Sequence, residues 1–374
     1  ILTASCKKEK GIEEVAEIGV KRMHTVFVEN EIPIENLFEL KEIIPVKIDE
    51  QNFLVDVYRL QVSDFGFFLL DKEFVTLIKT SKDGLQQVKI GEFGSGPEEL
   101  PDIADFSLSK IGSELLLISI EERSLAFFDL DGNFKKKIRL KNQADMLSVD
   151  KRRNIGMSIT YFNDDFSNFQ LLDSTGQKIS TMFPFPKDLF PILLKNVSGH
   201  VTSNFDGDIL YHEPANSIIF ELNGKDFFPK YQFESDEPMW PKEKKHELNN
   251  FFETLASGEL SFLTRFFEES ETHLYFGWNK KKKTNSPSVV DFRIGVFDKK
   301  TNETYLTKES KITSLMSGPM AVVGEDVYFV LSMYDLKELS SEVLFKEFGT
   351  KISQFEEDFK DKDFPVILKM SLIN

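Results

Sequence analysis

Five histidines and one cysteine are the side chains that could hold a transition metal or supply a reactive thiolate. The histidines are His24, His200, His212, His246 and His273. No two of them are four residues apart, the spacing at which a helix offers two imidazoles to one zinc ion. The lone cysteine, Cys6, excludes an internal disulfide and a cysteine-based metal site. No Gly-x-Ser-x-Gly sequence is present, so the serine elbow of acyl-transfer enzymes is missing too.

Two short motifs resemble ligand-binding loops only in part. Gly94-Ser95-Gly96-Pro97 lacks the Lys-Ser/Thr ending and the following helix of a phosphate loop. Asp129, Asp131 and Asn133 open like a calcium loop, but the glycine comes two positions too early and Leu140 stands at the twelfth position. We interpret both motifs as tight turns.

Charge and composition narrow the classes of partner. The 374 residues include 46 Lys and Arg against 62 Asp and Glu, a net charge of −16, and 41% are hydrophobic. This balance argues against nucleic acid as a partner, while the apolar fraction is ample for a packed core. Lys280-Lys281-Lys282-Lys283 is the longest basic run. It is interpreted as a solvated loop, with docking onto anionic lipid or an acidic partner as the alternative.

A repeated unit supplies the elements that must position any site. Each unit has an apolar strand, a second apolar strand, a turn centred on glycine, and a further strand. The turn glycines Gly84, Gly132, Gly176 and Gly224 are 48, 44 and 48 residues apart. A fifth unit has strands at 274–276 and 292–297 and turns at Asn302, and a sixth has strands at 327–331 and 364–372. Glycine or asparagine in such turns supplies the positive φ that a tight hairpin needs.

Units of this length with four antiparallel strands are typical of β-propeller blades. We therefore predict an all-β fold, a six-bladed β-propeller of four-stranded antiparallel blades. The sixth unit lacks its last strand, and the segment 38–48 is predicted to supply it and close the ring. The 37 phenylalanines suit the space between stacked sheets. Segments 243–255 and 336–348 are predicted to be helical insertions.

The predicted insertions point to a binding face. In a propeller, the loops between second and third strands and between blades share one face, and the other hairpins share the opposite one. The long insertions 236–257, 278–288 and 334–363 all fall on the first face, where elaborated loops usually bind. Within them lie Trp240, Trp278 and Tyr334, which we predict to be binding residues. The alternative is that the two tryptophans only pin the insertions to the propeller. Tyr161, Arg123, His200 and Glu98 are weaker binding candidates on the same face.

The first residues resemble the end of a bacterial lipoprotein signal peptide. Ile1-Leu2-Thr3-Ala4-Ser5-Cys6 places small residues before a lone cysteine, behind an apolar stub. The resemblance implies that Cys6 is acylated, the alternative being an idle or buried cysteine. We predict three parts: residues 1–6 as the end of the signal with the acylated cysteine, 7–36 as a tether, and 37–374 as the propeller. The expected address is the cell envelope, with the lipid as the sole membrane contact at the outer membrane.

Four further segments resemble a known family. They are Glu42-Ile43-Ile44-Pro45-Val46, Gly94 to Leu100, Phe127 to Phe134, and Tyr334-Asp335-Leu336-Lys337-Glu338. With them the chain resembles the six-bladed β-propeller lipoproteins of Bacteroidota, relatives of NHL-repeat propellers. The family mostly lacks an assigned activity, so the resemblance implies fold and address but no catalytic residue.

Three functional hypotheses follow from these patterns. The first is a monomeric envelope propeller that binds a protein partner or a small-molecule, glycan or peptide ligand through its elaborated face. The second is a lyase or hydrolase working in the central channel, with His200 near the axis. No cofactor is predicted, although Ca²⁺ or Zn²⁺ in the channel is left open. The third is a structural scaffold for envelope complexes.

Overall fold

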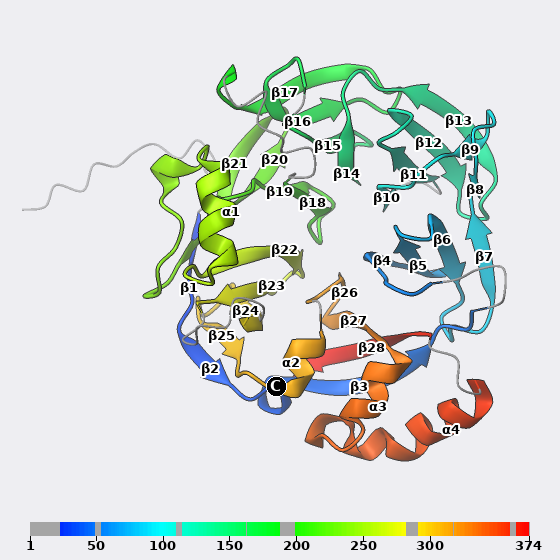
Figure 1. Ribbon diagram of the computed structural model, residues 1–374, viewed down its shortest axis with the longest axis vertical. Coiled ribbons are helices and arrows are strands. Elements are labelled where there is room, and N and C mark those ends of the chain that lie inside the picture. The colour runs from blue at the N-terminus through cyan, green and yellow to red at the C-terminus, as the bar shows by residue number, and fades with distance from the viewer. Residues whose placement is uncertain are drawn as a thin grey trace, which may run out of the picture.

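Six sheets stand in a ring around a central axis in the computed structural model (Figure 1). It describes residues 23–48, 54–109, 114–161, 163–187, 199–281, 291–316, 318–359 and 364–373. Each sheet contains four consecutive antiparallel strands in sequence order, apart from the last, which the N-terminal part of the chain completes. The predicted six-bladed propeller is confirmed.

The blades follow one another along the chain, and in each the first strand lies next to the axis (Figure 1). Blades one to three are β4 (Arg59–Ser63), β5 (Gly66–Asp71), β6 (Thr76–Thr80), β7 (Gln87–Ile90); β10 (Asp105–Leu108), β11 (Glu114–Ser119), β12 (Ser124–Asp129), β13 (Phe134–Arg139); and β14 (Ala144–Val149), β15 (Ile155–Ile159), β16 (Ser167–Leu172), β17 (Lys178–Pro184). Blades four to six are β18 (His200–Ser203), β19 (Ile209–His212), β20 (Ile218–Asn223), β21 (Asp226–Glu234); β22 (Phe262–Glu269), β23 (His273–Lys280), β24 (Asp291–Asp298), β25 (Thr304–Thr307); and β26 (Ala321–Val323), β27 (Asp326–Ser332), β28 (Pro365–Leu372), β3 (Phe38–Pro45).

The ring closes as the sequence predicts. Strand β3 pairs antiparallel with β28, from Pro45 opposite Val366 to Phe38 opposite Leu372. The first and last parts of the propeller are thereby joined within one sheet. Apolar side chains fill the space between neighbouring blades, as Phe68 and Leu70 of blade one do against Leu117 and Phe128 of blade two. Stacked blades with short outer strands leave little open edge.

The turn at Gly84 supports this closure directly. Its φ is +75°, its carbonyl accepts the Lys47 N–H at 2.9 Å, and a Cβ there would lie 2.0 Å from the Pro45 carbonyl oxygen. Gly224 occupies the equivalent turn of blade four with a φ of +70°, and nothing lies within 4 Å of a Cβ there. Both turns need a left-handed residue, but only one of them is pressed against another blade.

These two glycines offer a matched pair of variants. Gly224→Ala should lower the free energy of unfolding by about 1 kcal/mol, the conformational penalty alone. Gly84→Ala adds a backbone clash to the same penalty, and we expect a loss of about 3 kcal/mol. Urea unfolding of both variants measures the difference, and equal losses would show that the Gly84 turn does not hold the closing strand.

Residues 24–36 were predicted to belong to a tether, but they pair with the propeller. Strand β1 (His24–Phe27) pairs parallel with β21, and β2 (Asn30–Ile32) pairs parallel with β25. A short 3₁₀ turn, η1 (Ile34–Asn36), leads from there into β3. The tether prediction is therefore wrong from His24 onward, because the outer strands of blades four and five offer unpaired backbone groups that this segment satisfies. Cys6 and the rest of residues 1–22 lie outside the described part of the chain.

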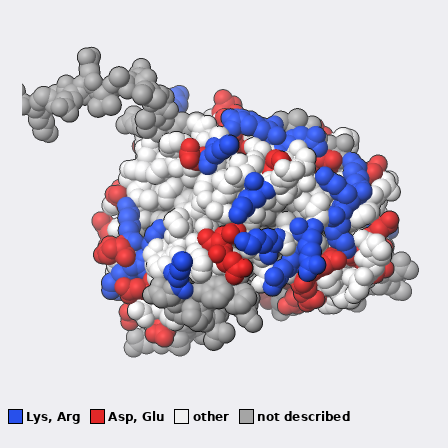
Figure 2. Space-filling view, turned by 90° about the horizontal axis from the view of Figure 1, so that it is seen from above, with Lys and Arg blue, Asp and Glu red and all other residues white. Residues whose placement is uncertain are grey.

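Blade two protects its outer edge differently. Strand β13 carries Lys135, Lys136, Lys137 and Arg139, and Lys135, Lys136 and Arg139 are exposed. Figure 2 views this side of the ring, where Lys and Arg gather despite the acidic composition of the chain. Lysine on an edge strand opposes pairing with a second molecule, so edge protection is sufficient to explain this cluster.

Apart from η1, the helices of the described part follow either a second or a fourth strand. They are η3 (Lys242–Lys244), α1 (Leu248–Ala256), α2 (Lys311–Leu315), α3 (Met333–Leu339), η4 (Val343–Phe348) and α4 (Gly349–Phe359). Their connections share one face, here called the helical face, and the face of the remaining hairpins is called the hairpin face. Helical insertions on one face are thus confirmed. In the described part no helix is long and apolar enough to cross a bilayer.

The helix boundaries differ from the predicted ones for local reasons. Helix α1 begins at Leu248 rather than at 243, because the 3₁₀ turn η3 follows Pro241 and occupies the first part of that segment. Helix α3 begins at Met333, since the Ser332 hydroxyl caps it by accepting the Asp335 N–H at 3.0 Å. Strands β8 (Glu92–Phe93) and β9 (Glu99–Leu100) form a small parallel pair between blades one and two.

Candidate functional site

One buried arginine crosses the central channel. Arg59 is the first residue of β4 and is 8% exposed. Its Nη1 donates to the carboxylate of Asp105 in blade two and to the Leu147 carbonyl of blade three at 3.4 Å, and its Nη2 donates to the Val201 carbonyl of blade four at 3.3 Å. Blades one and four are opposite in a ring of six, so this guanidinium must cross the axis.

Asp105 completes the arrangement. It is fully buried, and the oxygen that accepts from Arg59 also accepts the Leu147 N–H at 2.8 Å. A buried charge is tolerated only where a counter-charge and hydrogen bonds replace water, and here both are present. We call Arg59 and Asp105 the channel bolt, because they join four blades and divide the channel into two compartments.

The compartment toward the hairpin face is a wide cavity of about 840 Å³, here called the funnel. First strands run from the helical face to the hairpin face, and their far ends and the hairpins that follow line part of the funnel. The rest of the lining comes from β27, β28 and β3 of blade six and from the turns before β7 and β13. Phe65 and Phe205 stand in two of these hairpins and are 64% and 42% exposed, and Val323 adds a third exposed apolar side chain. The funnel thus combines ligand-sized volume with exposed aromatic rings.

Carboxylates outnumber cations on the funnel wall. The lining includes Glu42, Asp64, Glu269, Glu271 and Glu325 against Lys82 and Lys369. Glu269 is held by Lys230 at 2.8 Å and by Lys299 at 2.9 Å, which neutralises it. Asp64 and Glu271 take part in none of the ion pairs or hydrogen bonds found in the described part of the chain. The wall therefore presents uncompensated acidic groups to a ligand.

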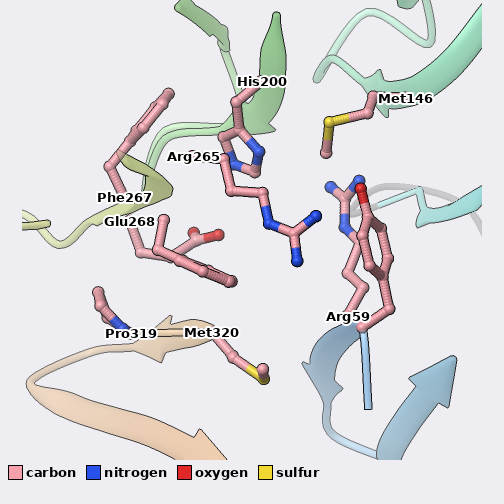
Figure 3. A pocket seen from close by; sticks show the side chains of 10 residues that line it. Arg59, Met146, His200, Arg265, Phe267, Glu268, Pro319 and Met320 are labelled. Carbon is pink, nitrogen blue, oxygen red and sulfur yellow. The ribbon is translucent and has the colours of Figure 1, made fainter. Parts of the chain in front are cut away.

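The compartment toward the helical face is a narrow pocket of about 20 Å³, large enough for a single water-sized group. Its lining comes from the near ends of the first strands of blades one, three and four, from residues 265–268 of β22 in blade five, and from the residues before β26. These residues are Tyr58, Arg59, Met146, His200, Arg265, Phe266, Phe267, Glu268, Pro319 and Met320. Figure 3 shows the Arg265 guanidinium lying among His200, Glu268 and Arg59.

His200 is the ionisable group of this pocket without a satisfied partner. Both ring nitrogens are inaccessible to solvent, and neither has a hydrogen-bond partner in the described part of the chain. Burial, and then the nearby Arg59 and Arg265 guanidiniums, hold the pKa of His200 well below its usual value. The imidazole is therefore neutral, with one donor and one acceptor nitrogen.

Only one of the seven predicted binding residues reaches the channel. That residue is His200, at the start of the first strand of blade four as expected. Tyr334, on α3, is 63% exposed, and Arg123 and Glu98 are exposed in loops of the helical face. No described contact joins these three residues, so their role in binding stays a prediction.

The aromatic anchors are corrected. Trp278 lies within β23 and not in an insertion, is 0% exposed, and stacks on Phe233 with ring centroids 5.9 Å apart. Tyr161 is 2% exposed and packs on Phe185 at 4.9 Å. Both predictions of surface binding are wrong, because β23 is buried on both faces and Tyr161 packs into an apolar cluster with Phe251 of α1. Trp240 packs on Phe251 and donates from Nε1 to the Lys244 carbonyl at 2.9 Å. These two contacts connect separate parts of the same insertion.

The partial motifs are turns. Asp129 accepts the N–H groups of Asp131 and Asn133 at 3.0 and 2.9 Å, and the Glu99 carboxylate accepts the Gly96 N–H at 2.8 Å. Across the described ranges, no three His, Cys, Asp or Glu side chains are grouped so that they could hold a metal ion. Lys280 pairs with Glu31 and Glu237, whereas residues 282 and 283 of the basic run lie outside the described part.

The residues that sequence reasoning missed are Arg59, Asp105, Arg265, Phe65 and Phe205. Two of them have a visible signal, since Arg59 and Asp105 each stand directly before a short segment of alternating apolar residues. An ionisable residue at the start of an innermost strand is a candidate for the channel. The others depend on loop and strand geometry and carry no signal of their own.

Comparison with known proteins gives a family and a fold. Residues 23–371 match the model of DUF4934, "Domain of unknown function". No curated protein matches. A "Putative exported protein" of Bacteroides fragilis NCTC 9343 is similar with 16% identity and a TM-score of 0.76, over 94% of this chain and 100% of that one. A DUF4221 family member of Bacteroides vulgatus ATCC 8482 shows 12% identity and a TM-score of 0.58, over 91% and 99%. The resemblance to six-bladed Bacteroidota propellers is confirmed, and at these identities the solved structures establish the fold alone.

Proposed function

This chain belongs to the DUF4934 family, which brings no assigned activity, and we propose from its own geometry that it is a ligand-binding propeller. The ligand occupies the funnel on the hairpin face. The observation that carries the proposal is a cavity of about 840 Å³ at the channel mouth, within the usual range for small-molecule sites, rimmed by exposed phenylalanines.

The funnel replaces the helical face as the proposed site of ligand binding. Of the three aromatic residues on which that face was selected, Trp278 is core and Trp240 is packed against its own insertion. Phe65 and Phe205, in contrast, are large apolar side chains exposed at a concave surface, where they gain most by being covered.

The wall chemistry favours a ligand rich in amino or hydroxyl groups, such as a short peptide or an oligosaccharide. Asp64 and Glu271 accept hydrogen bonds from such donors, and a cationic group gains further from an aromatic face. The protein already uses both rings in this way, since Lys299 lies 4.5 Å from the Phe205 centroid and Lys79 lies 5.9 Å from that of Phe65. A ligand with a dense negative charge is disfavoured by the same wall.

Arrays of short peptides and oligosaccharides, followed by titration calorimetry of the hits, test this proposal. Phe65→Ala combined with Phe205→Ala should weaken binding about tenfold or more, since two buried aromatic contacts are lost. Phe93→Ala is the matched control, because Phe93 is 63% exposed but lies between blades one and two, on the helical face. A hit whose affinity is unchanged in the double variant would place its site elsewhere.

For the cellular address we keep the envelope, with a lipid on Cys6 as the anchor. Support comes from the residues before Cys6 and from the "Putative exported protein" among the similar structures. The mass of the N-terminal peptide from the native protein tests the anchor, and an unmodified Cys6 would refute it.

A further inference from the structure

An irregular strand brings an unpaired cation to the narrow pocket. Strand β22 pairs with β23 at Leu263 opposite Trp278 and again at Phe267 opposite Phe276. Three residues of β22, including Arg265, therefore face the single residue Gly277. Bulges of this kind bend a strand and re-aim its side chains, and they are frequent beside functional sites.

Two glycines make room for the bulge. A Cβ on Gly277 would lie 2.3 Å from the Thr264 hydroxyl oxygen. Gly318 has a φ of +116°, and a Cβ there would lie 2.8 Å from the Cβ of Phe266. The Thr264 hydroxyl also accepts the Phe266 N–H at 3.2 Å, which closes the bulge on itself. Two close approaches at glycines and one hydrogen bond thus define the position from which Arg265 projects.

Two cations contact the ring of Tyr58, which lines the pocket together with the carboxylate of Glu268. The Arg265 guanidinium carbon lies 4.3 Å from the centroid of the Tyr58 ring, and the Lys72 Nζ lies 3.4 Å from the same point. Neither Arg265 nor Lys72 takes part in any ion pair found among the described residues. Each of these cations therefore keeps a positive charge available to an anion that approaches the Tyr58 ring.

The interior of the pocket supplies a third group. His200 is neutral and has two buried nitrogens without partners, so one N–H is available as a donor. The acid of the pocket, Glu268, accepts a hydrogen bond from the Thr202 hydroxyl at 3.1 Å and keeps its negative charge. The volume of about 20 Å³ admits one oxygen-sized group, and Arg265 is exposed to solvent outside it.

We infer that Arg265, Lys72 and His200 form a binding site for an oxyanion at the helical-face mouth of the channel. The group bound is a carboxylate, phosphate or sulfate, with one oxygen toward His200 and the others toward the two cations. Arg59 separates this site from the funnel, so it is independent of the ligand proposed there. The acidic chain thus concentrates opposite chemistries at the two mouths, with acidic groups in the funnel and cations here.

Calorimetric titration of the full chain with inorganic phosphate, and separately with acetate, tests this site at constant ionic strength with chloride as the balancing anion. Wild type should bind one phosphate saturably. Arg265→Gln should weaken binding about tenfold or more, because a charge-assisted bidentate contact is lost, and Lys72→Gln should weaken it less. Tighter binding of acetate than of phosphate would identify the natural group as a carboxylate.

Lys346→Gln is the control, since it removes one positive charge from an exposed position on η4 of the same face. This variant should bind phosphate as wild type does. Arg265 is exposed, so its replacement should leave the unfolding midpoint unchanged, and the measurement reports binding alone. Lack of saturable binding of both anions, or equal loss in Lys346→Gln and Arg265→Gln, would overturn the inference.

Discussion

Replacing Asp105 with alanine should lower the free energy of unfolding by about 3–5 kcal/mol, the usual cost of leaving one partner of a buried ion pair alone. The variant leaves the Arg59 guanidinium without its counter-charge at the centre of the channel, where the Arg59 side chain is 9% exposed. It also removes the acceptor of the Leu147 N–H. Because the channel bolt joins four blades, the loss should appear as cooperative unfolding of the whole ring.

A surface ion pair between the same two blades provides the control. Lys79 of blade one reaches Asp131 of blade two at 3.3 Å, and the Asp131 side chain is 82% exposed. Exposed pairs of this kind contribute little, so Asp131→Ala should unfold at nearly the wild-type urea concentration. If Asp105→Ala also unfolds there, the channel bolt does not hold the ring together.

The paired replacement Arg59→Met with Asp105→Leu distinguishes two roles of the channel bolt. One is to stabilise the ring, and the other is to separate the funnel from the narrow pocket. Apolar side chains of similar volume often restore the stability lost when one member of a buried pair is removed. The double variant should therefore be more stable than Asp105→Ala alone. It also removes the charge that separates the funnel from the oxyanion site, so binding at each mouth can be measured without the bolt.

The outer architecture was predictable because its signals are local. Apolar strands ending in a glycine turn recur at a constant period, and Gly84, Gly132, Gly176 and Gly224 all have positive φ. The closing strand was inferred by counting, since the sixth unit lacked a partner. Periodicity and turn chemistry thus predicted the second, third and fourth strands of each blade.

Apart from the first strand of blade four, where His200 was expected, the innermost strands could not be located from the sequence for a physical reason. They are short, and half of their side chains face a polar channel, so they lack a continuous apolar run. Strand β10 has four residues and begins with a buried aspartate, and β18 has four and begins with His200. The side chains that define the two channel compartments therefore lie on the strands with the weakest sequence signal.

The geometry of the site depends on contacts that no local pattern encodes. Residues 262–269 read as one continuous strand, and the bulge that turns Arg265 toward the channel appears only in the pairing with β23. The contact of Arg59 with blades two, three and four spans up to 142 residues of sequence. Such contacts follow from ring closure, which fixes distances that composition and period leave open.

Trp278→Ala tests whether Trp278 stabilises the core, as its burial indicates, or binds a ligand, as its residue type suggested. Trp278 is fully buried between blades four and five, stacked on Phe233 and edge-on to Phe276. We expect the variant to lose about 3–5 kcal/mol of unfolding free energy, the usual cost of truncating a large aromatic side chain in a packed core. Urea unfolding followed by circular dichroism measures this loss.

Trp240→Ala is the matched comparison, because the two tryptophans have the same sequence signal. Trp240 is half-buried and packs against a small apolar cluster between α1 and the blades, so its loss should loosen α1 while the six blades unfold near the wild-type urea concentration. If Trp278→Ala were as stable as Trp240→Ala, the packing of blade five would be looser than its burial indicates. If ligand binding fell in both variants by the same factor without any loss of stability, the ligand would bind at the helical face and not in the funnel.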